Sequence, residues 1–438
     1  MSKDGRCSMN NVWKKAVSLT MMAAMSLPMA GCGKKGDYVH GKKGYYFQVE
    51  NGISSEVTKQ GSGGCWAHAA TSAILSTSLI RDNKALGLTP IDVMKDVLTG
   101  HDEGWHYDLD VNMTPGCDSM VINALSDGIG NDGLVLVETL FYSYLDENEV
   151  HQNIASREQI QEIIKTKGAV TATLSFASAN FYGMDHGYYT LYDDPVKKTK
   201  HHHEVCLVGW DDNFPKEYFG GYLGKELPKS DGAWLAKDSM GPDYANDGYF
   251  WISYESNLSY YCLYYMSDKY SKVLSYDGGC LDSVQVVTEN VAANVFHEKG
   301  KLAAVGTFAG IKEVLGNDYV MDPNLTKLKI EVRDETMTQV LASKEVKFEY
   351  PGYYVVDLDE PLEVENYSIV VTYESQIPLE SEVLESHHGI YYTSRIEEGQ
   401  SFILKDGKWI DLSDASIKEI LGLEYTPNNV CIKALYVD

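Results

Sequence analysis

The sequence predicts an α+β fold in two parts, a region in which helices precede strands and a second region made of strands alone. Residues 46–130 hold the strongest helical patterns, including an uninterrupted run of small and apolar residues from Trp66 to about Arg81. Beyond about residue 165 the apolar runs become short and rich in β-type residues. After Ser256, seven strand candidates follow one another at turn-punctuated spacing, which is typical of a β-sandwich.

Length and charge narrow the classes of function. At 438 residues the chain is longer than one ordinary domain and fits two. Its hydrophobic content of 44% is enough to fill sizeable cores. The net charge of −26 leaves no basic stripe for phosphates, so we expect no nucleic-acid partner.

The N-terminus has the pattern of an export signal. Two lysines precede an apolar run that is too short to span a membrane comfortably, and the run ends in Met-Ala-Gly-Cys at residues 29–32. This ending resembles a bacterial lipobox, so residues 1–31 are expected to be a lipoprotein signal peptide and Cys32 the lipidated residue. Residues 32–45, rich in Lys and Gly, then form a tether beside the membrane. A plain secretory signal is the alternative.

The most informative stretch is a glycine-rich loop, Gln60-Gly61-Ser62-Gly63-Gly64, that ends at Cys65 directly before the helical run. Unpaired backbone N–H groups and the helix dipole favour the thiolate over the thiol at such a position. A buried structural cysteine is the simpler interpretation. A partner base elsewhere in the chain is needed to displace it.

That base is found downstream. His203 directly precedes an apolar strand, residues 204–210, and Asp238 follows another apolar run. His203 lies 138 residues after Cys65, and Asp238 lies 35 residues after His203. The order indicates a nucleophile, a base and a residue that orients the base.

Together these segments resemble the papain-like cysteine peptidases, in particular bacterial ones with a C-terminal lectin-like domain. The resemblance implies a peptidase domain over residues 46–256, divided by a cleft into a helical subdomain and a β subdomain. It implies a linker over residues 257–274 and a lectin-like β-sandwich over residues 275–438. The enzyme is then expected to hydrolyse peptide bonds of a protein or peptide without any cofactor, and the second domain to bind a glycan or cell-wall ligand.

The resemblance also implies residue roles. Cys65 corresponds to the nucleophile and His203 to the base, and the Gln60 amide would hold the oxyanion together with the backbone N–H of Cys65. Asp238 stands where the family usually has Asn. A carboxylate there would orient the imidazole and also stabilise its charged form.

Three further residues are expected to bind substrate. In the family a Gly-Gly pair lets the substrate backbone pair in β-fashion with the enzyme, and here Gly116 and Cys117 hold those positions. Gly64 is the third. A mere helix start at Asp118 is the alternative for this segment. Two other departures are a loop one residue shorter between Gln60 and the cysteine, and Met240 where the family usually has Trp.

A metal site and a disulfide bond are two further possibilities that the sequence raises. His201 and His202 suggest a metal site with their neighbour, but nothing nearby completes a zinc set, so we expect no metal. Cys262 and Cys280 are candidates for a disulfide bond, although spacing cannot fix connectivity.

The leading hypothesis is an extracytoplasmic, surface-anchored cysteine endopeptidase that is held in the membrane by a lipid anchor. The first alternative is a catalytically impaired peptidase scaffold that captures a surface ligand or glycan. A Cys-His peptidoglycan amidase is a third reading, disfavoured because those domains are shorter and place His much closer to Cys.

Overall fold

The computed structural model describes most of the chain beyond the N-terminus. The described residues are 43–61, 63–99, 104–107, 116–128, 130, 133–145, 151–174, 181–182, 187–193, 203–220, 227–280, 282–284, 286, 290–315, 318–381, 390–423 and 426–438. The expected signal peptide, the lipidation site Cys32, most of the tether, and His201 and His202 lie outside them.

Five α-helices are described, four of them in the first half of the chain. The helix that begins at Cys65 buries small side chains on most of its circumference, so neighbouring elements approach it closely. A capping box between Ser156 and Gln159 starts a helix that the sequence analysis did not predict. The helices are α2 (Cys65–Asp82), α3 (Pro90–Thr99), α4 (Asp118–Asp127), α5 (Arg157–Thr166) and α6 (Ile417–Leu421), with 3-10 helices η1 (Val49–Asn51) and η3 (Lys216–Phe219).

The strands of the first part of the chain form a sheet around β9, which is buried along its whole length and pairs with β1, β6 and β10. Helix α2 packs against β9. The strands are β1 (Tyr45–Phe47), β2 (Gly104–Tyr107), β3 (Val135–Phe141), β4 (Ser143–Leu145), β5 (His151–Asn153), β6 (Val170–Leu174), β7 (Phe181–Tyr182), β8 (Thr190–Leu191), β9 (His203–Asp211), β10 (Ala233–Lys237), β11 (Tyr249–Ser253) and β12 (Ser259–Ser267).

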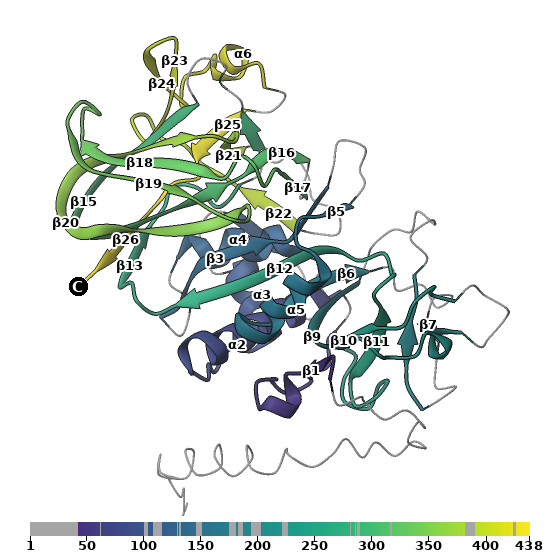
Figure 1. Ribbon diagram of the computed structural model, residues 1–438. Coiled ribbons are helices and arrows are strands. Elements are labelled where there is room, and N and C mark those ends of the chain that lie inside the picture. Colours follow the sequence, from purple (N-terminus) through teal and green to yellow (C-terminus); the bar gives the residue numbers. More distant parts are fainter. Residues whose placement is uncertain are drawn as a thin grey trace, which may run out of the picture.

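The second part is almost entirely β-structure, built around two long antiparallel strands, β15 and β20. In Figure 1 these green-to-yellow strands lie on one side of helices α2 to α5, and β9 to β11 lie on the other. The strands are β13 (Lys272–Leu274), β14 (Asp282–Val284), β15 (Val291–Ala309), β16 (Ile311–Leu315), β17 (Asp318–Met321), β18 (Lys327–Asp334), β19 (Val340–Lys347), β20 (Gly352–Tyr373), β21 (Ile377–Ser381), β22 (Ile390–Thr393), β23 (Ser401–Lys405), β24 (Lys408–Asp411), β25 (Pro427–Val430) and β26 (Lys433–Val437).

The two parts are joined by hydrogen-bonded strands. β3 pairs with the start of β20, with Tyr353 opposite Thr139, and β2 pairs with β22. Residues 257–274, which we expected to form a linker, do not have the local structure of one. Those residues hold β12, which pairs with β3 and β6, followed by β13. Tyr and Cys side chains on both faces of β12 are buried, because the strand lies between helices and a second layer of side chains.

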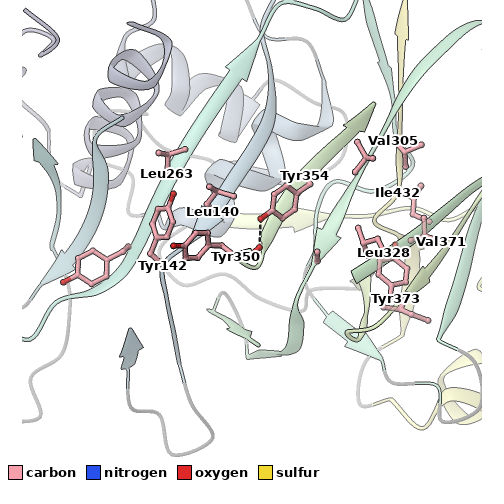
Figure 2. Close-up of a cluster of buried hydrophobic side chains, with 14 of the residues drawn as sticks. Leu140, Tyr142, Leu263, Val305, Leu328, Tyr350, Tyr354, Val371, Tyr373 and Ile432 are labelled. Atoms are coloured by element: carbon pink, nitrogen blue, oxygen red, sulfur yellow. Dashed lines mark hydrogen bonds between the residues drawn. The ribbon is translucent and has the colours of Figure 1, made fainter. Parts of the chain in front are cut away.

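Aromatic side chains fill the junction between the parts. Tyr142, directly after β3, meets the edge of Tyr350 with ring centroids 4.8 Å apart. The Tyr354 hydroxyl donates to the backbone carbonyl of Tyr350, and Leu140 and Leu263 lie beside these rings (Figure 2). The core of the first part therefore continues into the second.

None of the six cysteines within the described ranges forms a disulfide bond with another of them; they are Cys65, Cys117, Cys206, Cys262, Cys280 and Cys431. The suggested bond between Cys262 and Cys280 is therefore not formed. Both side chains are buried, Cys262 on β12 and Cys280 in the loop before β14.

Candidate active site

Cys65 is the first residue of α2, as the sequence predicted. Gly64 occupies the N-cap position and supplies no side-chain cap, so the N–H groups of the first turn point toward the open end of the helix. A Cβ atom on Gly64 would lie 2.8 Å from the Met94 side chain. The absence of a side chain at this position thus lets the loop pass closely over α3.

His203 and Asp238 come from neighbouring strands of the sheet. His203 is the first residue of β9, and Asp238 directly follows β10, which pairs with β9. The His203 Nε2 atom lies 2.8 Å from the Asp238 Oδ1 atom, and the two residues are only 5% and 3% exposed. The orienting bond inferred from the sequence is present, with a carboxylate as its acceptor.

The sulfur and the imidazole also meet. Cys65 and His203 form a side-chain hydrogen bond across the boundary between helix and sheet. Burial alone would lower the pKa of His203, but the hydrogen bonds and charges of Asp238 and Cys65 outweigh it and raise that pKa to about 9. Burial would also raise the pKa of Cys65, but His203 and the backbone N–H groups of Glu204 and Trp66 lower it. Both shifts favour a thiolate beside an imidazolium.

Gln60 is held against the segment that carries Asp238. The Gln60 backbone N–H donates to the carbonyl of Ser239 over 2.7 Å, and the Ser239 hydroxyl donates to the Gln60 side-chain oxygen. Lys59 and Met240 form an adjacent β-bridge. Because its oxygen is occupied, the Gln60 side chain keeps its NH2 group as the end that is available to an acceptor.

Two of the three expected substrate-binding residues, Gly116 and Cys117, lie at the start of α4, and the third, Gly64, caps α2. Cys117 is the N-cap of this helix and contacts the Ser119 hydroxyl through its sulfur over 3.1 Å. A Cβ atom on Gly116 would lie 2.4 Å from the Trp66 ring, so glycine is needed there for the ring to pack. Gly116 is therefore tied to the residue after the candidate nucleophile.

Sequence reasoning missed a pair of buried carboxyl groups beside Cys65. Glu204 on β9 hydrogen-bonds Asp118 on α4, and Asp118 accepts from the Tyr264 hydroxyl. Burial and the adjacent Asp118 raise the pKa of Glu204 well above its usual value, because both disfavour a second negative charge there. The available signal was Glu204 itself, an acidic residue at the start of the otherwise apolar segment 204–210.

Sequence reasoning also gave no role to His68, which lies one helical turn after Cys65. Its Nδ1 atom is 2.6 Å from the Thr58 hydroxyl, and the residue is buried behind the catalytic candidates. The spacing of three residues from Cys65 on one helix face was the signal that pointed to it.

The described part of the chain has neither a metal-binding cluster nor a membrane-spanning helix. No three His, Cys, Asp or Glu side chains in it gather closely enough to hold a metal ion. Among the same described residues, no helix is both long and apolar enough to cross a membrane.

Comparison with known families gives two matches that follow one another along the chain. A family described as papain family cysteine protease matches residues 138–270, a range that includes His203 and Asp238 and begins after Cys65. A family described as lectin like domain matches residues 273–436. No curated protein matches the sequence.

Solved structures match nearly the whole chain. One is the clostridial cysteine protease Cwp84 after propeptide cleavage, at 21% identity and a TM-score of 0.67, covering 90% of this chain and 99% of that one. Another holds the cysteine protease and lectin-like domains of Cwp84, a surface layer associated protein of Clostridium difficile, at 19% identity and a TM-score of 0.66, covering 92% and 91%. These similarities confirm the predicted fold class.

Proposed function

We propose that this chain, a papain-family cysteine protease followed by a lectin-like domain, is an extracytoplasmic endopeptidase in which Cys65 and His203 act as a thiolate–imidazolium pair. The observation that carries the proposal is the chain of contacts from Cys65 to His203 and from His203 to Asp238. Nucleophile, base and orienting residue stand in the order that acyl transfer through a cysteine requires.

The contacts support a two-step reaction. The Cys65 thiolate attacks the carbonyl carbon of the scissile bond, and the resulting oxyanion accepts hydrogen bonds from the Gln60 NH2 group and the Cys65 backbone N–H. His203 then gives its proton to the leaving amine, which leaves a thioester on Cys65. In the second step neutral His203 removes a proton from water, the hydroxide attacks the thioester, and the peptide acid and the free Cys65 are released.

Substrate binding and location form the outer part of the proposal. Gly116, Cys117 and Gly64 would line the path of the substrate backbone beside the nucleophile. Cys32 would carry a lipid anchor that holds the enzyme at the cell surface, where the lectin-like domain binds a glycan or cell-wall ligand. The similarity to Cwp84, a surface layer associated protein, supports an extracytoplasmic setting.

The test is covalent labelling combined with peptide cleavage. The purified protein is incubated with an epoxide inhibitor of papain-type enzymes and, separately, with a peptide library, with Cys65→Ala as the control. We expect one label, located on Cys65 by mass spectrometry, and cleavage products that the control does not give. A folded wild-type protein that takes no label and cleaves nothing would refute the enzyme and favour a ligand-binding scaffold.

A further inference from the structure

A small cavity lies behind the His203–Asp238 pair. The space that the centre of a water molecule can occupy in it is about 10 Å³, which matches one water. Polar residues make up most of its lining: Thr58, His68, Ser72, Glu204, Lys237, Asp238 and Ser239. A polar cavity of this size holds an ordered water where buried groups need a partner.

Asp238 supplies such a group. Its Oδ1 atom accepts both from His203 Nε2, at 2.8 Å, and from the Ser239 backbone N–H, at 2.7 Å. Its Oδ2 atom is buried, and no partner for it exists among the described residues. An ionised carboxylate oxygen left without a donor in the interior is costly.

His68 also lines the cavity and can supply the matching donor. Burial and the charge of Lys237 lower the pKa of His68 to about 4, so the ring is neutral at neutral pH. The Thr58 hydroxyl lies 2.6 Å from Nδ1. When that hydroxyl donates to Nδ1, the ring proton is on Nε2, which makes Nε2 a donor.

We propose that one water molecule occupies this cavity, accepts a hydrogen bond from His68 Nε2 and donates one to Asp238 Oδ2. The inference rests on the proposed function, because it makes His68 a positioning residue that acts on His203 through Asp238. It also explains how a carboxylate is accommodated where the family usually has an amide.

Other charged and titratable groups face this pair of residues. The charge of Lys237 acts on His68, but the Lys237 Nζ atom is held by the carbonyl and hydroxyl of Ser55, at 3.0 and 2.6 Å. Tyr244 faces Asp238 from the loop after β10 and stays neutral, since burial raises its pKa to about 12. His203 and Glu204 face the site from β9. Glu204 lines the cavity, its Oε1 atom is buried without a partner among the described residues, and burial together with Asp118 raises its pKa well above the usual value. Burial and Lys237 thus lower the pKa of His68, and the negative charge of Asp238 opposes them without outweighing them.

The experiment measures the alkylation rate of Cys65 by iodoacetamide from pH 5 to 10, which reports the thiolate–imidazolium pair without requiring peptidase activity. The variants are His68→Phe, which removes the donor, and His68→Gln, whose amide nitrogen can replace Nε2. Each is made alone and together with Asp238→Asn. Thr58→Val is added in case His68→Phe does not fold.

We expect His68→Phe to lower the pH at which the pair is lost by roughly one unit, because the negative charge that stabilises the His203 imidazolium becomes costlier. His68→Gln should restore most of the shift, and Thr58→Val should give a smaller shift of the same sign. In the Asp238→Asn protein, His68→Phe should add no shift.

Equal shifts by His68→Phe in both backgrounds, or none in either, would overturn the proposal, as would failure of His68→Gln to restore the profile. A crystal structure with no water within hydrogen-bond distance of both atoms would do so as well. If the protein cleaves no peptide, the alkylation profiles still decide the role of His68, so failure of the enzyme and failure of this inference are separable.

Discussion

Two buried ion pairs, one in the candidate active site and one at the domain junction, are built in opposite ways. At the junction, Lys433 on β26 is 1% exposed, and its ammonium contacts Asp277 at 3.0 Å, Asp127 at 3.3 Å and the Ser275 hydroxyl at 2.9 Å. Burial would lower the pKa of Lys433, but the two carboxylates raise it. Every donor of this lysine therefore has an acceptor.

The pair in the active site is left incomplete. His203 and Asp238 are equally buried, yet one oxygen of Asp238 has no protein partner in the described part of the chain. The second side-chain hydrogen bond of the His203 imidazole goes to the half-buried Cys65 and not to a buried structural group. The comparison teaches that protein groups alone satisfy the Lys433 ammonium, whereas one oxygen of Asp238 in the candidate catalytic pair depends on a donor from outside the described residues.

The largest effect is expected from removing the nucleophile. Cys65→Ala should reduce peptide hydrolysis by on the order of 10⁴-fold or more, because no other group can form the acyl intermediate. Its thermal midpoint should stay close to that of the wild type, because the Cys65 side chain is half-buried and the junction is untouched. Activity within tenfold of the wild type, measured with a fluorogenic peptide, would show that Cys65 is not the nucleophile.

Breaking the junction pair should change stability. Lys433→Ala leaves Asp277 buried without its counter-charge and should lower the free energy of unfolding by about 3–5 kcal/mol. Lys272→Ala is the matched control, since Lys272 pairs with Glu298 at 2.9 Å on the surface and should contribute only about 0–1 kcal/mol. Urea unfolding measures both. Equal losses from the two variants would mean that burial does not set the strength of the junction pair.

A smaller loss is expected at the oxyanion site. Gln60→Ala should reduce kcat by roughly 10²- to 10³-fold with little change in KM, because its NH2 group bonds the oxygen mainly in the transition state. Ser239→Ala should give a milder loss of the same kind, since it frees the Gln60 side chain without removing it. A Gln60→Ala enzyme with unchanged kcat would place the oxyanion elsewhere.

Local sequence patterns predicted much of the site. Cys65 follows a glycine-rich loop and opens an apolar helix, and His203 opens an apolar strand, so each carries its signal in its immediate neighbours. The proximity of Asp238 to His203 followed from their order in a known family. The contact between Asp118 and Glu204 had no such signal, because it depends on how α4 packs on the sheet.

Pairings between distant segments were also beyond sequence reasoning. The register of β3 with β20 joins residues more than 200 positions apart, and nothing in either strand specifies the partner. Residues 259–267 looked like a linker because their Tyr-rich pattern does not alternate between polar and apolar. Strands buried on both faces lack that alternation.

The account depends most directly on the charge that Asp238 places beside His203, and the pH profile of kcat/KM for wild type and Asp238→Asn tests it. The imidazolium is lost as the pH rises through the His203 pKa of about 9, which sets the alkaline limb of the wild type. Replacing the carboxylate by a neutral amide should lower that pKa, so the alkaline limb should move down by roughly one to three units while measurable activity remains. An unchanged limb would contradict the account, and an inactive wild type beside an active Asp238→Asn variant would mark the chain as a disabled peptidase.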